Sequence, residues 1–138
     1  MSRNIFVNLP VRNLADSRTF YEALGATNNP QFSDDTAACM VFSETIFVML
    51  LTHAKWAFFT NKPISDAHAA SEVMLALSFE SRAGVDAAAQ AAGKAGGVTD
   101  VNPPQDYGFM LNRSFEDPDG HVWEAMWMDS KAMPARGQ

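Results

Sequence analysis

Short apolar runs and two helical stripes recur along the chain in the same order. Residues 5–9 form a β-rich run that ends at Pro10, and residues 14–24 have helical periodicity. The apolar stripe of that helix consists of Leu14, Phe20, Tyr21 and Leu24. Asn13 can cap its N-terminus, and Gly25 can adopt the positive φ that ends a helix. The pattern therefore predicts a strand followed by a helix.

Three further strands are predicted before the middle of the chain, at residues 27–32, 38–42 and 46–51. The turn-forming residues Asp34-Asp35 and Ser43-Glu44-Thr45 separate them. Strands joined by such short connections form a meander, so residues 1–52 make one βαβββ module.

The same order of elements returns from residue 72. A strand is predicted at 73–79, a helix after Ser81 that ends at Gly96-Gly97, and strands at 98–101, 108–115 and 122–128. The helix carries Val85, Ala88, Ala89 and Ala92 on one face. Asp117-Pro118-Asp119-Gly120 has the residues of a type I turn and joins the last two strands. Residues 72–129 are therefore a second βαβββ module, and residues 130–138 are a tail.

The linker at residues 53–71 is longer than most connections in compact domains. It contains Trp56, Phe58 and Phe59, which could cover a cleft or anchor a dimer contact. Packing of a linker helix against the body explains the same aromatics equally well. Both interpretations stay open at this stage.

Alternation along the strands separates two sheet faces. One face is continuously apolar and is expected under the helices: Ile5, Val7, Leu9, Val73, Leu75, Leu77, Phe79, Trp123, Ala125 and Trp127. The other mixes apolar side chains with a few polar groups: Phe6, Asn8, Met74, Ala76, Ser78, Glu124, Met126 and Met128. Bulk burial with sparse polar groups is typical of a small-molecule site, although the face could equally meet another subunit.

Composition excludes several classes of protein. The chain has 138 residues, of which 47% are apolar, and this suits one domain with its own core. The single cysteine, Cys39, excludes an intramolecular disulfide and a cysteine zinc site. A net charge of −6 without a basic cluster argues against nucleic acid as a partner. No signal sequence or membrane span is evident near the N-terminus, so a cytoplasmic protein without a membrane partner is expected.

Two motifs point to a family. The first motif is the opening Asn4-Ile5-Phe6-Val7-Asn8-Leu9-Pro10-Val11-Arg12-Asn13-Leu14, followed by Phe20-Tyr21-Glu22. The second is the closing Phe115-Glu116-Asp117-Pro118-Asp119-Gly120-His121-Val122-Trp123-Glu124. Together they resemble the glyoxalase/bleomycin resistance/extradiol dioxygenase (vicinal oxygen chelate) superfamily. The resemblance implies an α+β fold in which two βαβββ modules form curved mixed sheets with a concave cleft.

The resemblance also implies a divalent metal, held by His, Gln or Glu from the first, fourth, fifth and eighth strands. Those positions fall on Phe6, at or next to Met49, on Met74 and on Glu124. One carboxylate is too few ligands for such an ion. We therefore expect a protein without a cofactor, similar to the dimeric, metal-free bleomycin resistance branch. A metal-dependent lyase, isomerase or dioxygenase, similar to glyoxalase I, is the alternative.

Glu124 is the candidate general base or ligand-orienting carboxylate, so whether the protein is an enzyme stays open. The candidate ligand-binding residues are Phe6, Asn8, Met49, Met74, Ser78, Met126, Trp56 and Tyr107. His53 and His68 are expected on the surface, although an unforeseen metal site could use His53, and His121 is expected to be structural. Cys39 is expected to be buried. Arg113 could bind an acidic ligand, but pairing with Glu116 is the more ordinary expectation.

Overall fold

The computed structural model describes residues 3–132, and its first half is a four-stranded sheet with one covering helix. This module 1 contains β1 (Ile5–Val11), α1 (Leu14–Ala23), β2 (Thr27–Asn29), the 3-10 turn η1 (Pro30–Phe32), β3 (Ala37–Val41) and β4 (Ile46–Thr52). The strand order is β1-β4-β3-β2, with β1 and β4 parallel and the other pairs antiparallel. β1 is therefore an edge strand.

Module 2 repeats this arrangement in the second half of the chain. It contains β5 (Leu75–Ser78), α3 (Arg82–Lys94), β6 (Val98–Thr99), β7 (Gln105–Asp106), β8 (Met110–Glu116), β9 (Val122–Met128) and the 3-10 turn η2 (Ser130–Ala132). The order is β5-β9-β8-β6, with β7 also paired to β8 and with β5 parallel to β9. The α+β fold with two mixed sheets is thus as predicted.

Local signals place both main helices as the sequence predicted. The side chain of Asn13 accepts a hydrogen bond from the Asp16 amide at 3.0 Å, and Ser81 Oγ accepts one from the Gly84 amide at 3.0 Å. Gly25 follows α1 and Gly96 follows α3, each with φ of 101°. A residue with a side chain rarely adopts this conformation, so each glycine favours a chain reversal at the helix end.

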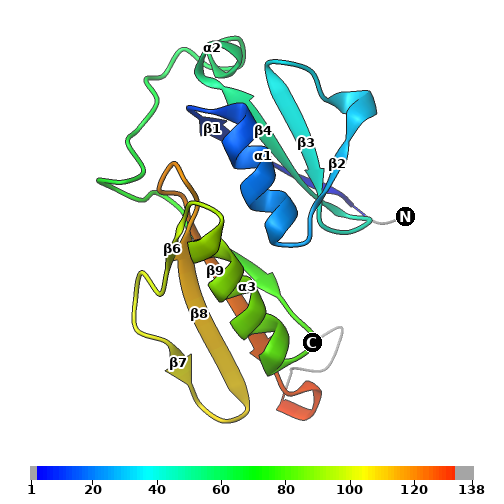
Figure 1. Ribbon diagram of the computed structural model, residues 1–138, viewed down its shortest axis with the longest axis vertical. Coiled ribbons are helices and arrows are strands. Elements are labelled where there is room, and N and C mark those ends of the chain that lie inside the picture. Colours follow the sequence, from blue (N-terminus) through cyan, green and yellow to red (C-terminus); the bar gives the residue numbers. More distant parts are fainter. Residues whose placement is uncertain (1–2, 133–138) are drawn as a thin grey trace.

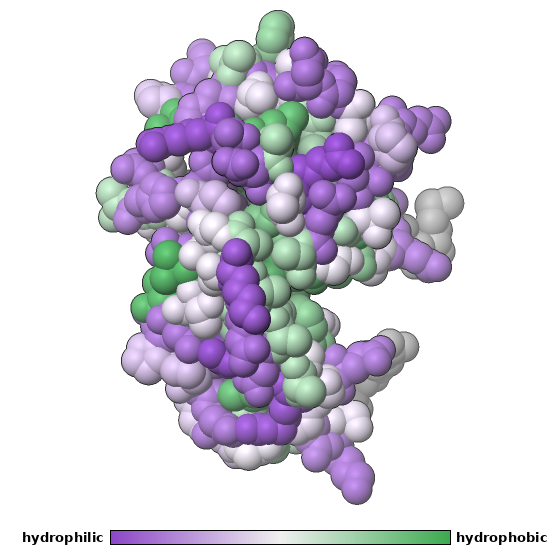
Figure 2. Space-filling view, viewed as in Figure 1, coloured by the Kyte–Doolittle hydropathy of each residue, from purple (hydrophilic) through white to green (hydrophobic). Residues whose placement is uncertain are grey.

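Each helix covers one face of its own sheet (Figure 1). In module 2, Trp123 and Ala125 of β9 are buried on that face, as predicted, and they pack with Val85 of α3. In module 1, Leu9 and Val11 of β1 are buried, whereas Ile5 at the start of the strand is exposed. Seen from the helix side, the upper module is mostly hydrophilic and the outline is notched between the modules (Figure 2).

A buried chain of hydrogen bonds joins the two modules. Tyr21 of α1 donates its hydroxyl hydrogen to Asp117 Oδ2 at 2.6 Å, and Trp123 Nε1 donates to the Tyr21 hydroxyl oxygen at 3.0 Å. Asp117 Oδ1 accepts from the backbone amides of Asp119 and His121. Burial raises the pKa of the Asp117 carboxyl, and the hydrogen bonds from Tyr21 and from the His121 amide work against that rise. The Asp-Pro-Asp-Gly turn therefore anchors module 2 to α1.

Several element boundaries differ from the sequence prediction. The strand predicted at 27–32 ends at Asn29. The side chain of Asn29 accepts a hydrogen bond from the Gln31 amide, and this contact starts η1. The strand predicted at 98–101 ends at Thr99, because Asp100 has φ of 55°, which breaks a strand. The strands predicted at 73–79 and 108–115 begin at Leu75 and Met110, and the short β7 was not predicted.

The predicted pairing of Arg113 with Glu116 is wrong. Residues 113 and 116 of one strand point to opposite faces, since side chains alternate. Arg113 instead lies 2.8 Å from Asp100 Oδ2 and 2.9 Å from Asp86 Oδ1. Hydrogen bonds from Arg113 lower the pKa of the Asp100 carboxyl. This cation therefore joins β8 to α3 and to the segment after β6.

The linker is mostly irregular and contains one helical turn, α2 (His53–Trp56), directly after β4. Within residues 3–132, none of the helices has the length and apolar character needed to cross a membrane. Of the predicted tail, residues 130–132 form η2, and residues 133–138 lie outside the described part of the chain.

Candidate functional site

The sheet faces opposite the helices carry most of the predicted site residues, and we call them the open faces. In module 2, the backbone register places Glu124 between Ala76 and Ser114, and Met126 between Ser78 and Asn112. The next pair along the same face is Met110 and Met128. Thioethers and small polar groups therefore alternate over this face.

Glu124 lines a cavity of about 230 Å³, and we call it the Glu124 pocket. Its lining residues are Met74, Asn102, Pro103, Gln105, Asn112, Ser114 and Glu124. Ser114 Oγ accepts a hydrogen bond from the Asn102 amide at 2.8 Å, which fixes one wall. Glu124 itself is half-buried, and within residues 3–132 its carboxylate has no ion pair or hydrogen bond. A carboxylate placed in this way can take a ligand group.

The open face of module 1 is aromatic at its edge. Phe6 of β1 stacks on Phe47 of β4, with ring centroids 4.6 Å apart and planes 11° apart. Asn8 lies beside Met49 in the register of the same two strands. Phe6 is 54% exposed, so a flat apolar surface is open at this edge.

Two predicted site residues, Asn8 and Trp56, come together in a different cavity. This cavity of about 330 Å³ lies under the linker and is also lined by Lys62, Glu72 and His121 among others, and we call it the linker groove. The linker aromatics Phe58 and Phe59 are exposed, with the Lys55 ammonium 5.6 and 5.8 Å from their ring centroids. Trp56 is therefore a groove residue and does not line the Glu124 pocket.

Tyr107 lies at the turn between β7 and β8, where it is exposed and stacks on Phe109 at 6.2 Å between centroids. It does not line the Glu124 pocket, although Gln105 of the same hairpin does. Tyr107 is thus an exposed residue of the hairpin that carries Gln105, and its role at a site stays a prediction.

The three histidines and the cysteine are absent from the lining of the Glu124 pocket. His121 Nε2 lies 2.9 Å from the carbonyl oxygen of Pro10, which links β9 to β1. His53 and His68 are exposed, as expected. Cys39 is buried on β3, and burial raises the pKa of its thiol, so this side chain is not poised as a nucleophile.

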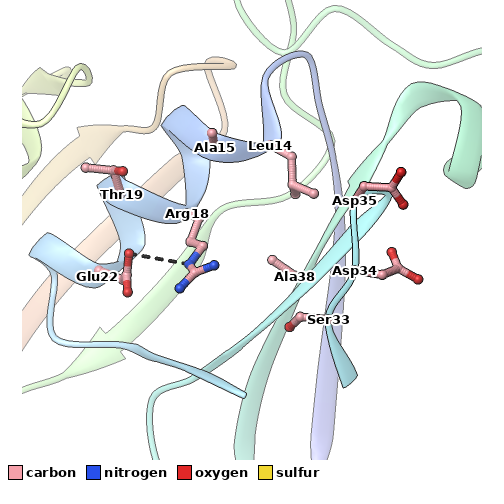
Figure 3. A pocket seen from close by; sticks show the side chains of 9 residues that line it. All are labelled: Leu14, Ala15, Arg18, Thr19, Glu22, Ser33, Asp34, Asp35 and Ala38. Carbon is pink, nitrogen blue, oxygen red and sulfur yellow. Dashed lines mark ion pairs between the residues drawn. The ribbon is translucent and has the colours of Figure 1, made fainter. Parts of the chain in front are cut away.

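A further cavity, about 510 Å³, lies between α1 and the segment before β3 (Figure 3). Its polar groups already bind one another. Arg18 pairs with Glu22 at 3.6 Å, and Asp34 Oδ1 accepts from Thr36 Oγ1 at 2.7 Å and from the Thr36 amide at 2.8 Å. Arg18 and Glu22 are nearly half-exposed. We therefore regard this cavity as a solvated surface groove.

The sequence and the fold match a known family. The family described as "Glyoxalase/Bleomycin resistance protein/Dioxygenase superfamily" matches residues 5–125. The chain belongs to this superfamily. No curated protein matches the chain.

Several solved structures share the fold along nearly the whole chain. A glyoxalase-related enzyme from Fulvimarina pelagi has a TM-score of 0.77 at 17% identity, and the match covers 99% of this chain and 94% of that one. A hypothetical protein from S. aureus has a TM-score of 0.76 at 24% identity, with 92% and 95% covered. The fosfomycin resistance protein FosX from Mesorhizobium loti has a TM-score of 0.64 at 18% identity, with 95% and 93% covered.

The side chains of this superfamily member do not fit a divalent metal at the positions that the resemblance implies. At the expected first-strand position, Phe6 stacks on Phe47. At the expected fourth-strand position, Met49 lies beside Asn8. Around Glu124 the other potential donors are a thioether, amides and a hydroxyl. Within residues 3–132 no three His, Cys, Asp or Glu side chains are grouped to hold an ion. This donor set is unsuited to zinc, iron, nickel or manganese.

Four residues of the open faces were missed by sequence reasoning: Phe47, Gln105, Asn112 and Ser114. The faces were assigned only for the first, fifth and last predicted strands. Applying the same alternation to residues 110–116 places Asn112 and Ser114 beside Glu124, so the signal was present. Gln105 had no such signal, because β7 is only two residues long.

Proposed function

We propose that this protein binds a small, partly apolar molecule on its open faces without a resident metal, in the manner of a glyoxalase/bleomycin-resistance-like binding protein. The observation that carries the proposal is the Glu124 pocket. It combines one carboxylate with no partner among the described residues, a wall of amides, and an adjoining surface of thioethers. Ligand sites typically combine apolar burial with a few orienting polar groups.

Within this proposal, Glu124 orients the ligand by accepting hydrogen bonds from it. Asn112 and Gln105 can both donate and accept, so they can match further polar groups on the same molecule. Met74 and Met126 supply adaptable apolar contact. The proposal is supported by this combination of residue types in one cavity.

The first test is elemental analysis of the purified protein after mild dialysis. We expect well below one equivalent of zinc, nickel, iron or manganese per chain, because Glu124 alone leaves most of the coordination sphere to water. A Glu124→Gln variant measured in parallel is the control for residual surface metal, and it should give the same content. About one equivalent per chain, lost in Glu124→Gln, would contradict the proposal and favour a metal-dependent enzyme.

We also propose that a second copy of the chain completes the site. β1 and β5 are both edge strands, and each presents unpaired backbone groups along one side. The exposed apolar side chains Ile5, Phe6, Val73 and Met74 lie on or directly before these two strands, and each is more than half exposed. Apolar side chains concentrated at two open sheet edges favour a two-fold partner.

Light scattering tests this homodimer. We expect about twice the 15.1 kDa mass of one chain at high micromolar concentration. Phe6→Glu should shift the mass toward one chain, because it places a charge in the proposed contact. Phe32→Glu is the matched control, since Phe32 is also exposed but lies on η1, away from both edges. A monomeric unmodified protein would refute the dimer.

A further inference from the structure

The distribution of charge over the strands restricts the class of ligand, and this inference rests on the function proposed above. We infer that the site prefers a flat apolar molecule that carries an amine cation over one that carries a carboxylate.

The strands contain a single cationic side chain within the described residues, Arg113. Arg113 points toward the helix side, where Asp86 and Asp100 bind it. Within residues 3–132 the strands therefore supply no cation to the open faces, whereas Glu124 of β9 contributes a negative charge to module 2. Lys62 is in the linker groove, and Glu72 lines the same groove.

The surroundings of Glu124 strengthen its effect on a ligand charge. Ala76 and Ser114 flank it across the sheet, Met74 lines the same pocket, and Glu124 itself is half-buried, so a molecule bound there displaces water from beside the carboxylate. A charge interaction is stronger where polarisable water is displaced. A carboxylate ligand would lose its hydration here and meet a like charge, whereas an ammonium would gain a partner.

The apolar side chains outside the pocket lining suit an aromatic ring on the same molecule. Met110, Met126 and Met128 lie on the same face as Glu124, and thioethers make favourable contacts with aromatic rings. Phe6 and Phe47 supply a stacked aromatic surface on the other module. The chemistry that fits both features is an aromatic or polycyclic amine.

Three probes that differ in their polar group test this inference: the cation 1-naphthylmethylammonium, the neutral alcohol 1-naphthylmethanol, and 1-naphthylacetate, the anion of 1-naphthylacetic acid. Protein labelled with ¹³C at its methionine methyl groups is titrated with each probe and followed by NMR. Five of the eight methionines lie on the open faces: Met49, Met74, Met110, Met126 and Met128. Met40 is fully buried on the helix side, so its signal is the internal control.

We expect the open-face signals to shift with the ammonium probe and the Met40 signal to stay in place. The ammonium should bind at least about tenfold more tightly than the acetate, with the alcohol between them. Glu124→Gln should reduce that preference to within about threefold, whereas Glu80→Gln, an exposed carboxylate outside the pocket, should leave it unchanged.

The outcomes separate the two proposals. Open-face shifts with equal affinities, or with preference for the acetate, would overturn the charge preference and leave the binding site intact. Retention of the full preference in Glu124→Gln would overturn the role of Glu124. Absence of open-face shifts with all three probes would overturn the proposed binding function together with this inference. The comparison among probes uses the unmodified protein, so it does not depend on the folding of any variant.

Discussion

Tyr21→Phe is expected to lower the free energy of unfolding by about 2–4 kcal/mol. The hydroxyl of Tyr21 is fully buried, donates to Asp117 at 2.6 Å and accepts from Trp123 at 3.0 Å. Its removal leaves a buried carboxylate and a buried indole each short of one partner, and the desolvation of those groups is then uncompensated. Urea denaturation measures the loss as a lower midpoint with an unchanged slope.

Tyr107→Phe is the matched control, since it removes the same atom from an exposed side chain. Surface substitutions of this kind usually change stability by less than about 0.5 kcal/mol. If both variants lost the same small amount, the hydrogen bonds between the modules would contribute nothing measurable, and the anchoring role of the Asp-Pro-Asp-Gly turn would be wrong.

Gly97→Ala is expected to cost about 2–4 kcal/mol, because no space exists for a methyl group. A Cβ at this position would overlap the carbonyl oxygen of Glu116 and lie 2.7 Å from Cε1 of Phe20. Both obstacles are fixed: one is backbone of β8, and the other is a buried ring of α1. Thermal and urea unfolding should both show the loss.

Gly84→Ala is the opposite case and the control for Gly97→Ala. Gly84 lies in the first turn of α3, and a Cβ there meets Ser81 Oγ and Phe79 at 3.4–3.5 Å, which is ordinary contact. Alanine favours the helix over glycine by up to about 1 kcal/mol, so this variant should be more stable. A destabilised Gly84→Ala together with an unchanged Gly97→Ala would contradict the close approach of the modules.

The order of elements could be predicted from sequence because apolar periodicity and end signals agree. Asn13, Ser81, Gly25 and Gly96 mark helix ends that the structure confirms. The errors occur where a side chain interrupts a strand-like run. Asn29 starts a 3-10 turn within residues that are otherwise suited to a strand, and this competition between local hydrogen bonds and strand pairing cannot be decided from composition.

The candidate site was only partly predictable. The alternation of side chains along the strand correctly placed Glu124 and Trp123 on opposite sheet faces. The structure also groups Met74 with Glu124 in one cavity. Trp56 and Asn8 were proposed for the same cleft, but they line the linker groove. Their position depends on how the linker returns over the ends of β1 and β9, which is a tertiary property without a periodic signal in the sequence.

The contacts between the modules also determine when folding can finish during synthesis. Tyr21 is separated by 96 residues from Asp117 and by 102 from Trp123. At a translation rate of about 5–20 residues per second, the hydroxyl of Tyr21 waits roughly 5–20 s after its own synthesis before its partners exist. During that time the ring of Phe20 also lacks Phe115, which lies 6.3 Å away in the finished fold. The nascent first module therefore leaves the ribosome with an apolar helix face uncovered, and only the final quarter of the chain completes it.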